Sequence, residues 1–600
     1  MIDNISWLAI YPEIVLLAMA CVIMLVDLGV HSPRRTGTYV LTMLTLAVVA
    51  VLQGVYASSG NTFYGFGNMV VSDAMGNWLK CFATVAVMVT LVYGRPYAAD
   101  RGMLRGGELF TLSMLALLGM FIMISGNNFL VIYLGLELLT LSSYTLVALR
   151  RDNAMATEAA MKYFVLGAMA SGFLLYGLSM LYGATGSLDI GQVFKAVNSG
   201  QIRHQVLVFG LVFVVAGLAF KLGVVPFHMW IPDVYQGAPT AVTLMIGGAP
   251  KLAAFAITIR LLVDGLLPLA IDWQQMLAVL AIGSLLVGNL AAIAQTNLKR
   301  MLAYSTIANL GLIIACVGIN TAASMMAATT IIIYHSVSKG LLFMCVGAIE
   351  QRIGSRDIED MRGLYGKMPR TAIITAIGIF TMMLPPFGML IGKWMAIEAI
   401  ARATQAMTPI IFFIALGSAF TVLFWARWAG VLVSSSKMHE RPTHGHPKPS
   451  VMFALRSLCG LAVVFSFISP LVLKTFVEPS VSGVYARFNL QAEGFIPGAT
   501  LTGAEGYVWI YFLFLLLGLG VWYAWREARR VPESAHAQPY CSGLTAVKDG
   551  VVGFKGPMNV FEPVRVSNFY LSQYFGESKI TRAIDIISTA FLVVLVGGLL

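Results

Sequence analysis

Seven ionisable side chains lie within or beside long apolar stretches of this 600-residue sequence. They are Glu137, Lys221, His228, Lys251, His335, Lys339 and Lys393. An ionisable group among apolar side chains is costly, and by default it marks a path for ions or protons. A lysine in such surroundings releases its proton more readily, and a nearby carboxylate favours the charged lysine. Because histidine exchanges protons near neutral pH, these residue types together indicate proton transfer.

Two of these lysines lie close to prolines that interrupt an apolar run. Lys221 comes just before Gly223 and the stretch Pro226–His228, and Lys393 follows the stretch Pro385–Gly388. Proline removes a helical hydrogen bond, and broken helices line ion sites in membrane transporters. We therefore expect a helix break beside each lysine, with His228 as a further relay at the first break.

Two of the assignments have structural alternatives. Lys251 follows the stretch Gly247–Pro250 and opens a helix, so its ammonium group could instead extend to the membrane surface. His335 could be a packed histidine of the interior. However, Lys339 lies four residues further on, which puts both side chains on one helix face. Glu137 is hardest to explain by packing, because a buried carboxylate either takes up a proton or requires a cation.

The composition is that of a membrane protein. Hydrophobic residues make up 58% of the chain and charged residues only 11%, compared with about 25% charged residues in soluble domains. Long unbroken apolar runs predict helices and not the alternating strands of a barrel. The net charge of +11 is spread over short loops, which indicates orientation in a membrane and not nucleic-acid binding. The six cysteines are widely spaced, so we expect no metal site and no redox cofactor in this chain.

We expect an all-α membrane protein with about 14–16 transmembrane helices. The last two predicted spans lie at 507–526 and 582–600, and the proline-interrupted stretch 527–581 is read as a cytoplasmic loop. Lys and Arg are concentrated in the loops that follow the odd-numbered helices. This distribution predicts that those loops are cytoplasmic and that the N-terminus lies outside.

The two predicted breaks fall in the seventh and twelfth helices, five helices apart. An odd separation reverses the direction of the second unit, as two inverted five-helix repeats require. Helices 4–8 would form the first repeat at 107–263, and helices 9–13 the second at 272–432. Three N-terminal helices at 1–106 and a C-terminal region at 433–600 would complete the chain.

Longer motifs resemble known families. Residues 1 to about 310 resemble subunit N of bacterial complex I, through the stretches 133–138, 156–164, 225–239 and 295–305. Residues from about 310 to 600 resemble the large membrane subunit of Ech-type energy-converting hydrogenases, through 352–361, 384–391 and 574–579, and 334–343 is similar to other antiporter-like families. A composite chain and a natural intermediate subfamily both explain this change, which falls near 298–311.

The resemblance implies a proton-translocating subunit of a redox-driven respiratory complex, an NADH:quinone oxidoreductase, with its redox centres in other chains. Its partners would be other membrane subunits and a peripheral redox arm, its surroundings the lipid of a bacterial inner membrane. The alternatives are a membrane subunit of an energy-converting hydrogenase, an Mrp-type cation/proton antiporter subunit, and a structural scaffold.

The family's functional positions correspond here to Glu137, Lys221, Lys251 and Lys393, while His335 and Lys339 match the members other than subunit N. Our hypothesis is that Glu137 modulates Lys221. Lys251 would then pass protons through the His335 and Lys339 pair to Lys393, which would form the exit.

Overall fold

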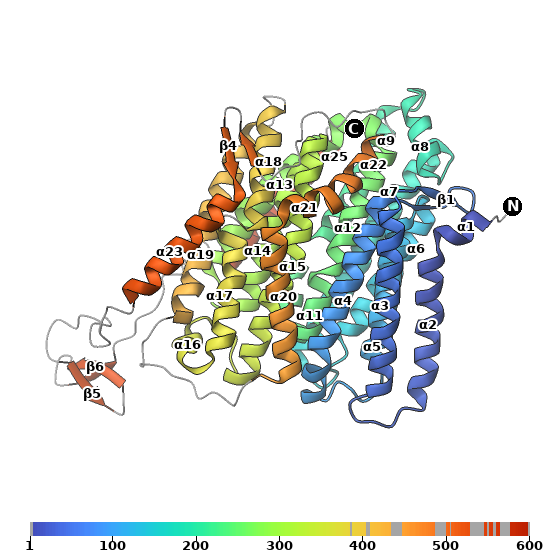
Figure 1. Ribbon diagram of the computed structural model, residues 1–600. Coiled ribbons are helices and arrows are strands. Elements are labelled where there is room, and N and C mark those ends of the chain that lie inside the picture. Colours follow the sequence, from blue (N-terminus) through green and yellow to red (C-terminus); the bar gives the residue numbers. More distant parts are fainter. Residues whose placement is uncertain are drawn as a thin grey trace.

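The structure is a computed structural model that describes residues 4–597 except 385–386, 404–407, 434–446, 487–499, 504–505, 529–544, 549–550, 556–559 and 564–575. Fourteen helical segments in this part of the chain are long and apolar enough to cross a membrane. They lie side by side in one bundle (Figure 1). They correspond one by one to the first fourteen predicted spans, so the all-α membrane fold is confirmed.

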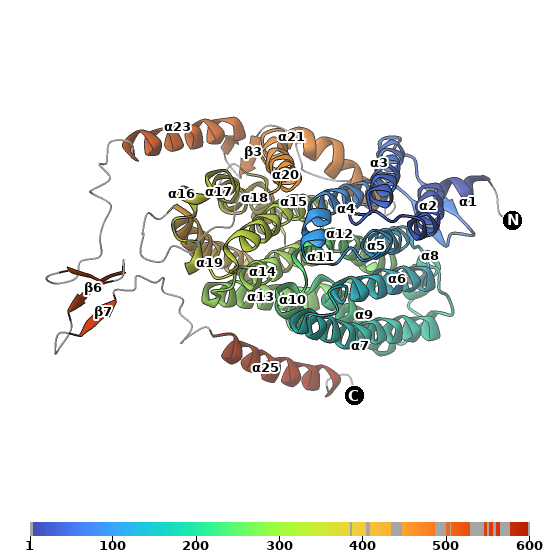
Figure 2. The same cartoon turned by 90° about the horizontal axis from the view of Figure 1, so that it is seen from below.

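The first three spans lie at one end of the bundle (Figure 2). They are α2 (Tyr11–Leu28), α3 (Thr36–Ser58) and α4 (Ala74–Asp100), with the short α1 (Asn4–Ala9) before them. A two-stranded antiparallel hairpin of β1 (Phe63–Gly65) and β2 (Val70–Ser72) joins α3 to α4.

The next five spans contain the first break. They are α5 (Glu108–Ser125), α6 (Phe129–Val147), α7 (Ala154–Thr185), α9 (His204–Leu222) with α10 (Trp230–Gly237), and α11 (Thr240–Gly247) with α12 (Ala249–Thr258). The short α8 (Ile190–Asn198) lies between α7 and α9, and the π-helical segment η1 (Ile259–Gly265) continues α12. Both the seventh and the eighth span are therefore built from two helices.

The following five spans contain the second interruption, in the twelfth span, while the thirteenth span is one continuous helix. They are α13 (Ala270–Ala294), α14 (Leu298–Ile319), α15 (Ala322–Ile353), α17 (Pro369–Met383) with α18 (Gly388–Arg402), and α19 (Thr408–Val433). Short helical turns η2 (Leu267–Leu269), η3 (Glu359–Met361) and α16 (Leu364–Lys367) lie in the connections. The twelfth span is interrupted between Met383 and Gly388, as expected, although Pro385 and Pro386 themselves are outside the described residues.

The rest of the chain begins with α20 (Pro449–Phe467), α21 (Ser469–Val472), η6 (Leu473–Val477) and α22 (Glu478–Ala486). The antiparallel pair β3 (Thr500–Gly503) and β4 (Gly506–Trp509) leads into α23 (Ile510–Ala528). Three further strands, β5 (Thr545–Lys548), β6 (Val551–Lys555) and β7 (Phe561–Pro563), form an antiparallel sheet before α25 (Glu577–Gly597). The helices α23 and α25 correspond to the predicted spans at 507–526 and 582–600.

Glycines allow close packing of the first two helices in each of these two groups of five spans, α5 with α6 and α13 with α14. A Cβ atom on Gly135 of α6 would lie 2.6 Å from the backbone nitrogen of Met123 in α5. In the second unit, a Cβ on Gly288 of α13 would lie 2.6 Å from the nitrogen of Ala308 in α14. Such approaches are closer than a side chain permits, and small residues at membrane helix interfaces allow them.

We predict that Gly135→Ala destabilises the assembled protein by about 1–3 kcal/mol, because the added methyl group overpacks the contact between α5 and α6. Gly172→Ala is the matched control, since its Cβ would meet nothing within 4 Å. Thermal unfolding of both variants in mild detergent measures the difference. Equal melting temperatures would show that the contact between α5 and α6 does not depend on the glycine.

Candidate functional site

The C-terminal end of α9 is a broken helix end inside the protein. Gly223 ends the helix with a left-handed φ of 83°, a conformation that glycine adopts without steric cost. The four terminal carbonyl groups therefore need partners other than the next turn. The carbonyl of Ala219 accepts from the backbone N–H groups of Gly223 and Val224. The carbonyl of Phe220 accepts from the Trp230 indole at 3.0 Å.

Lys251 supplies the partner of the last two carbonyl groups. Its Nζ donates to the carbonyl oxygens of Lys221 and Leu222, each at 2.9 Å. The same ammonium group lies 4.7 Å from the centre of the Trp230 ring. A cation at the negative end of a helix is favourable. Lys251 is only 1% exposed, so its side chain does not extend to the membrane surface.

Lys251 reaches this position because the eighth span is itself interrupted. The helix α11 ends at Gly247, Gly248 has φ −110° and ψ −86°, and α12 begins at Ala249. Lys251 is thus in the first turn of α12, in the interior of the bundle, beside the break of the neighbouring span.

Glu137 and Lys221 are electrostatic neighbours, and no ion pair within 4.0 Å joins these two described residues. Glu137 on α6 is half-buried and accepts a long contact of 3.5 Å from the hydroxyl of Thr140. A small cavity of about 20 Å³ is lined by Thr140, Lys221 and Lys251, among other residues. A space of this size is enough for one water molecule, and both lysines line it beside Thr140, whose hydroxyl contacts the Glu137 carboxylate.

His335 on α15 has two lysines as charged neighbours. The charged groups that act on it electrostatically are Lys339 and Lys251. His335 is 1% exposed, and neither ring nitrogen has a hydrogen-bond partner in the described part of the chain. Such an unpaired buried imidazole is unusual. The structure thus brings His335 and both lysines together, as expected for Lys339 from its spacing.

Lys339 on α15 is a second buried lysine with backbone contacts. Its Nζ donates to the carbonyl oxygen of Leu302 at 3.0 Å and to the hydroxyl of Ser305, both on α14. It lies 5.2 Å from the centre of the Trp425 ring on α19. Like Lys251, Lys339 is therefore a buried ammonium group that binds a backbone carbonyl oxygen and faces a tryptophan, although its second partner is a hydroxyl.

Lys393 lies on α18, one turn after the interruption of the twelfth span. It is buried, and no hydrogen-bond or ion-pair partner is recorded for it among the described residues. The beginning of α18 is held against α15, because a Cβ on Gly388 would lie 2.1 Å from the Tyr334 ring.

His228 lies in the turn between α9 and α10. It is buried, its Nδ1 has no partner among the described residues, and its ring lies 6.5 Å from that of Tyr304 on α14. The Val225–Pro226 peptide before it is cis, and the Val225 amide donates to the Ser284 hydroxyl at 2.9 Å. The first break is therefore bound to both α13 and α14.

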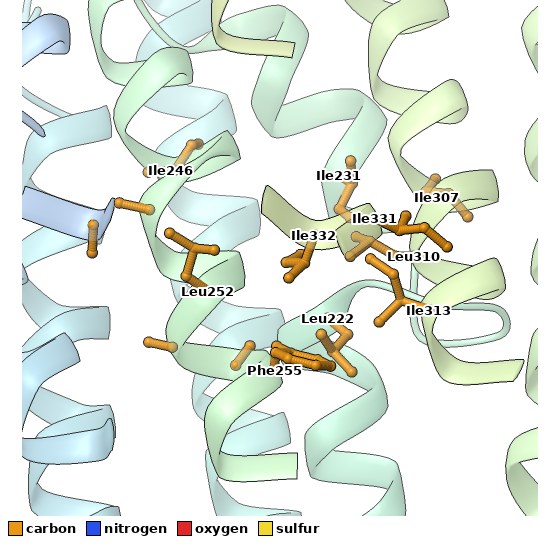
Figure 3. Packing of buried hydrophobic residues seen from close by; sticks show 14 of the residues in the cluster. Leu222, Ile231, Ile246, Leu252, Phe255, Ile307, Leu310, Ile313, Ile331 and Ile332 are labelled. Carbon is orange, nitrogen blue, oxygen red and sulfur yellow. The ribbon is translucent and has the colours of Figure 1, made fainter. Parts of the chain in front are cut away.

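Apolar side chains fill the space around these polar groups (Figure 3). Leu222, Leu252 and Phe255 lie near the first break, and isoleucines of α14 and α15 face them (Figure 3). These residues are almost fully buried. A low-dielectric lining strengthens the interactions between charges.

Several buried charged residues escaped the sequence prediction. Lys299 is fully buried and donates to the carbonyl oxygen of Ala238 at 2.7 Å. Glu350 accepts from Arg101 at 3.2 Å and from Arg356 at 2.9 Å. Both lie at helix ends, where the sequence resembles an ordinary loop, and only distant contacts bury them.

Two buried ion pairs could have been found from the sequence, because charged residues of both pairs lie inside predicted spans. Arg260 binds Asp73 at 2.8 Å, and Lys80 binds Glu13 at 2.5 Å. Arg260, Lys80 and Glu13 all lie inside predicted spans, so a count of charges within every span finds them. In the part of the chain that the structure describes, no group of three or more His, Cys, Asp and Glu residues could hold a metal ion.

We predict that Gly223→Ala disrupts the broken end of α9. The substitution adds a left-handed strain of about 1–2 kcal/mol, and its Cβ would lie 1.9 Å from Ile231 Cδ1. Gly200→Ala is the matched control, because Gly200 has a φ of 71° and no atom within 4 Å of the added Cβ. Thermal unfolding and the yield of assembled protein compare the two. Equal effects of both substitutions would contradict a tightly packed break.

Comparisons with known proteins agree with this geometry. A family model described as NADH:quinone oxidoreductase/Mrp antiporter, transmembrane, matches residues 126–421. The chain is 56% identical over 498 residues to NADH-quinone oxidoreductase subunit N of Polaromonas naphthalenivorans, and this match covers 81% of the chain and 99% of the relative. It is 43% identical to subunit N of Nitrosomonas europaea, over 77% of the chain and 95% of the relative. Likeness to subunit N therefore continues beyond residue 310.

Solved structures show the same fold. A chain of respiratory complex I from Thermus thermophilus is 29% identical, with a TM-score of 0.64, over 77% of this chain and 98% of that one. A chain of the Mrp complex from Dietzia sp. DQ12-45-1b is 19% identical with a TM-score of 0.70, over 80% of this chain and 98% of that one, and this likeness concerns the fold alone. The chain belongs to the family of NADH-quinone oxidoreductase subunit N, the antiporter-like membrane subunits of complex I.

Proposed function

We propose that this chain moves protons across the membrane for an NADH:quinone oxidoreductase, along Glu137, Lys221, Lys251, His335, Lys339 and Lys393. The observation that carries the proposal is the hydrogen-bonded contact of the Lys251 ammonium group with the carbonyl oxygens of Lys221 and Leu222. It supports a junction at which the two broken spans of the first unit meet.

The first step is the loading of Lys221. The Glu137 carboxylate favours the charged form of the lysine, and the small cavity beside Thr140 gives room for a bridging water molecule. When the carboxylate moves away, the apolar surroundings favour the neutral amine. Lys221 then releases its proton toward Lys251, its electrostatic neighbour.

The second step is transfer from the first unit to the second. His335 is suited to it, because Lys251 and Lys339 are its charged neighbours and neither of its nitrogens is bonded within the described residues. A proton taken up on one ring nitrogen can leave from the other. The hydroxyl of Ser305, bound to Lys339, would hold that lysine in place as its charge changes.

Lys393 would form the exit from the second unit, beside the interruption between α17 and α18. His228 would be a side relay at the first break, where Tyr304 faces it. The functional units would be 107–263 and 272–432, flanked by 1–106 and 433–600 with a cytoplasmic segment at 527–581. The N-terminus would lie outside, and the loops after odd-numbered helices in the cytoplasm of a bacterial cell.

The redox chemistry would take place in partner chains, so that this subunit holds no redox centre and binds no cofactor. The partners would be the other membrane subunits and the peripheral arm. An Mrp-type antiporter or a hydrogenase subunit is the alternative. Purification in mild detergent distinguishes the three candidates. A redox-driven complex brings iron–sulfur subunits with it, together with flavin subunits for an NADH:quinone oxidoreductase or nickel subunits for a hydrogenase. An antiporter brings only membrane subunits.

We predict that Glu137→Gln and Lys221→Ala each lower proton pumping by about 100-fold, the effect of losing a proton-transfer group. Assembly with the partner subunits should persist. Lys195→Ala, in the last turn of the short helix α8, is the matched control. Pumping is measured by dye quenching in inverted vesicles, relative to the amount of assembled complex. Normal pumping in both Glu137→Gln and Lys221→Ala would refute the route.

We further predict that Lys393→Ala blocks transfer while Glu137 and Lys221 remain intact, again by about 100-fold. Lys448→Ala, whose half-exposed side chain pairs with Asp100, controls for the loss of a lysine in the second half of the chain. The same vesicle assay applies. Unimpaired pumping by Lys393→Ala would remove the exit assignment and leave the first unit unaffected.

A further inference from the structure

A C-terminal segment with two further helices follows the fourteen long spans of this chain. The Polaromonas relative is matched over 99% of its length and still leaves about a fifth of this chain unmatched. The helices α23 and α25 follow the fourteen long spans in this segment. They lie on opposite flanks of the bundle (Figure 2).

The helix α25 lies beside the first part of the seventh span and is linked to the second part through Arg300. Ile584 and Ile587 line an apolar cavity of about 330 Å³ together with Pro226 and Phe227 of the break and residues of α9 and α13. At the beginning of α25, the Glu577 carboxylate binds the guanidinium group of Arg300. The C-terminal helix therefore lies alongside the broken span.

Arg300 connects Glu577 to the part of the span after the break. Its guanidinium group also binds Asp233 of α10 at 2.8 Å and the side chain of Gln236 at 2.8 Å. Asp233 in turn binds Lys162 of α7 at 2.7 Å. Arg300 is only partly exposed, so these charge-assisted hydrogen bonds are shielded from water and stronger than surface pairs.

The helix α23 makes the equivalent contact in the second unit. The Phe514 ring lies 6.0 Å from that of Phe387, which stands directly before α18, and 5.4 Å from that of Phe467 at the end of α20. The strand β3, which precedes α23, packs against α18. Each added helix thus contacts one of the two spans that carry a Pro-Phe break.

We propose that the C-terminal segment is an intramolecular clasp that holds both broken spans, with Glu577 as a positioning residue for α10 and Phe514 for the start of α18. Any effect of this clasp on proton transfer rests on the proposed function. The packing of α23 and α25 against the broken spans is independent of that function, because it depends only on the contacts of these two helices.

Hydrogen–deuterium exchange in the purified complex tests the clasp without a pumping assay. We expect Glu577→Gln to speed exchange of the α10 amides about tenfold, as the loss of a hydrogen bond between charged groups would. Glu577→Asp, which keeps the charge, should restore much of the protection. Asp585→Asn, two turns further along α25, is the matched control. Unchanged exchange in α10 with Glu577→Gln would overturn the role of Glu577.

The same exchange experiment tests the contact of α23 with α18 through Phe514→Ala. Leu515→Ala, on the exposed side of the same helix, is the control. We expect faster exchange in the first turn of α18 for Phe514→Ala only. If neither Glu577→Gln nor Phe514→Ala changes exchange at its break, the clasp is wrong. If both change exchange while Glu137→Gln leaves pumping normal, the clasp stands and the proton route falls.

Discussion

The contact of the Lys251 ammonium group with the broken end of α9 is the interaction on which the rest of the site depends. Breaking a helix inside a membrane leaves carbonyl groups without partners, and each one costs several kcal/mol unless it is satisfied. Here Trp230 and Lys251 satisfy the last three. The same contact holds the Lys251 ammonium group at the carbonyl oxygens of Lys221 and Leu222. In the proposed route, this one side chain would serve both a structural need and proton transfer.

Lys339 makes a comparable contact in the second group of five spans, although not at a broken helix end. Lys339 binds a carbonyl oxygen and a hydroxyl of α14 and faces Trp425, as Lys251 faces Trp230. Its span is not broken at that point, and the interruption lies instead between α17 and α18, near Lys393. A glycine contact joins the first two helices in both groups of five spans. The helix packing is therefore more similar between the two groups than the arrangement of the lysines. His335 has Lys251 and Lys339 as charged neighbours and two nitrogens without partners among the described residues, and in the proposed route it would join the two units.

Much of the architecture could be predicted because a membrane restricts the chain to long apolar helices, and prolines mark two of the interruptions. The spacing of His335 and Lys339 likewise placed both on one face. The interruption at Gly248 was harder, since the stretch Gly247–Pro250 reads equally well as the start of a helix. Lys299 and Glu350 were missed because their burial comes from Ala238 and from two arginines far away in the sequence. Distant contacts of this kind leave no local pattern.

The most direct test of the account is the number of protons moved per electron in proteoliposomes that contain the complex with Lys251→Met. The substitution keeps an unbranched side chain of similar length and removes the charge and the donors to the end of α9. The account predicts that NADH oxidation continues while fewer protons are moved per electron than by the unaltered complex. An unchanged ratio, with the complex fully assembled, would contradict the claim that Lys251 joins the two units of the proton route.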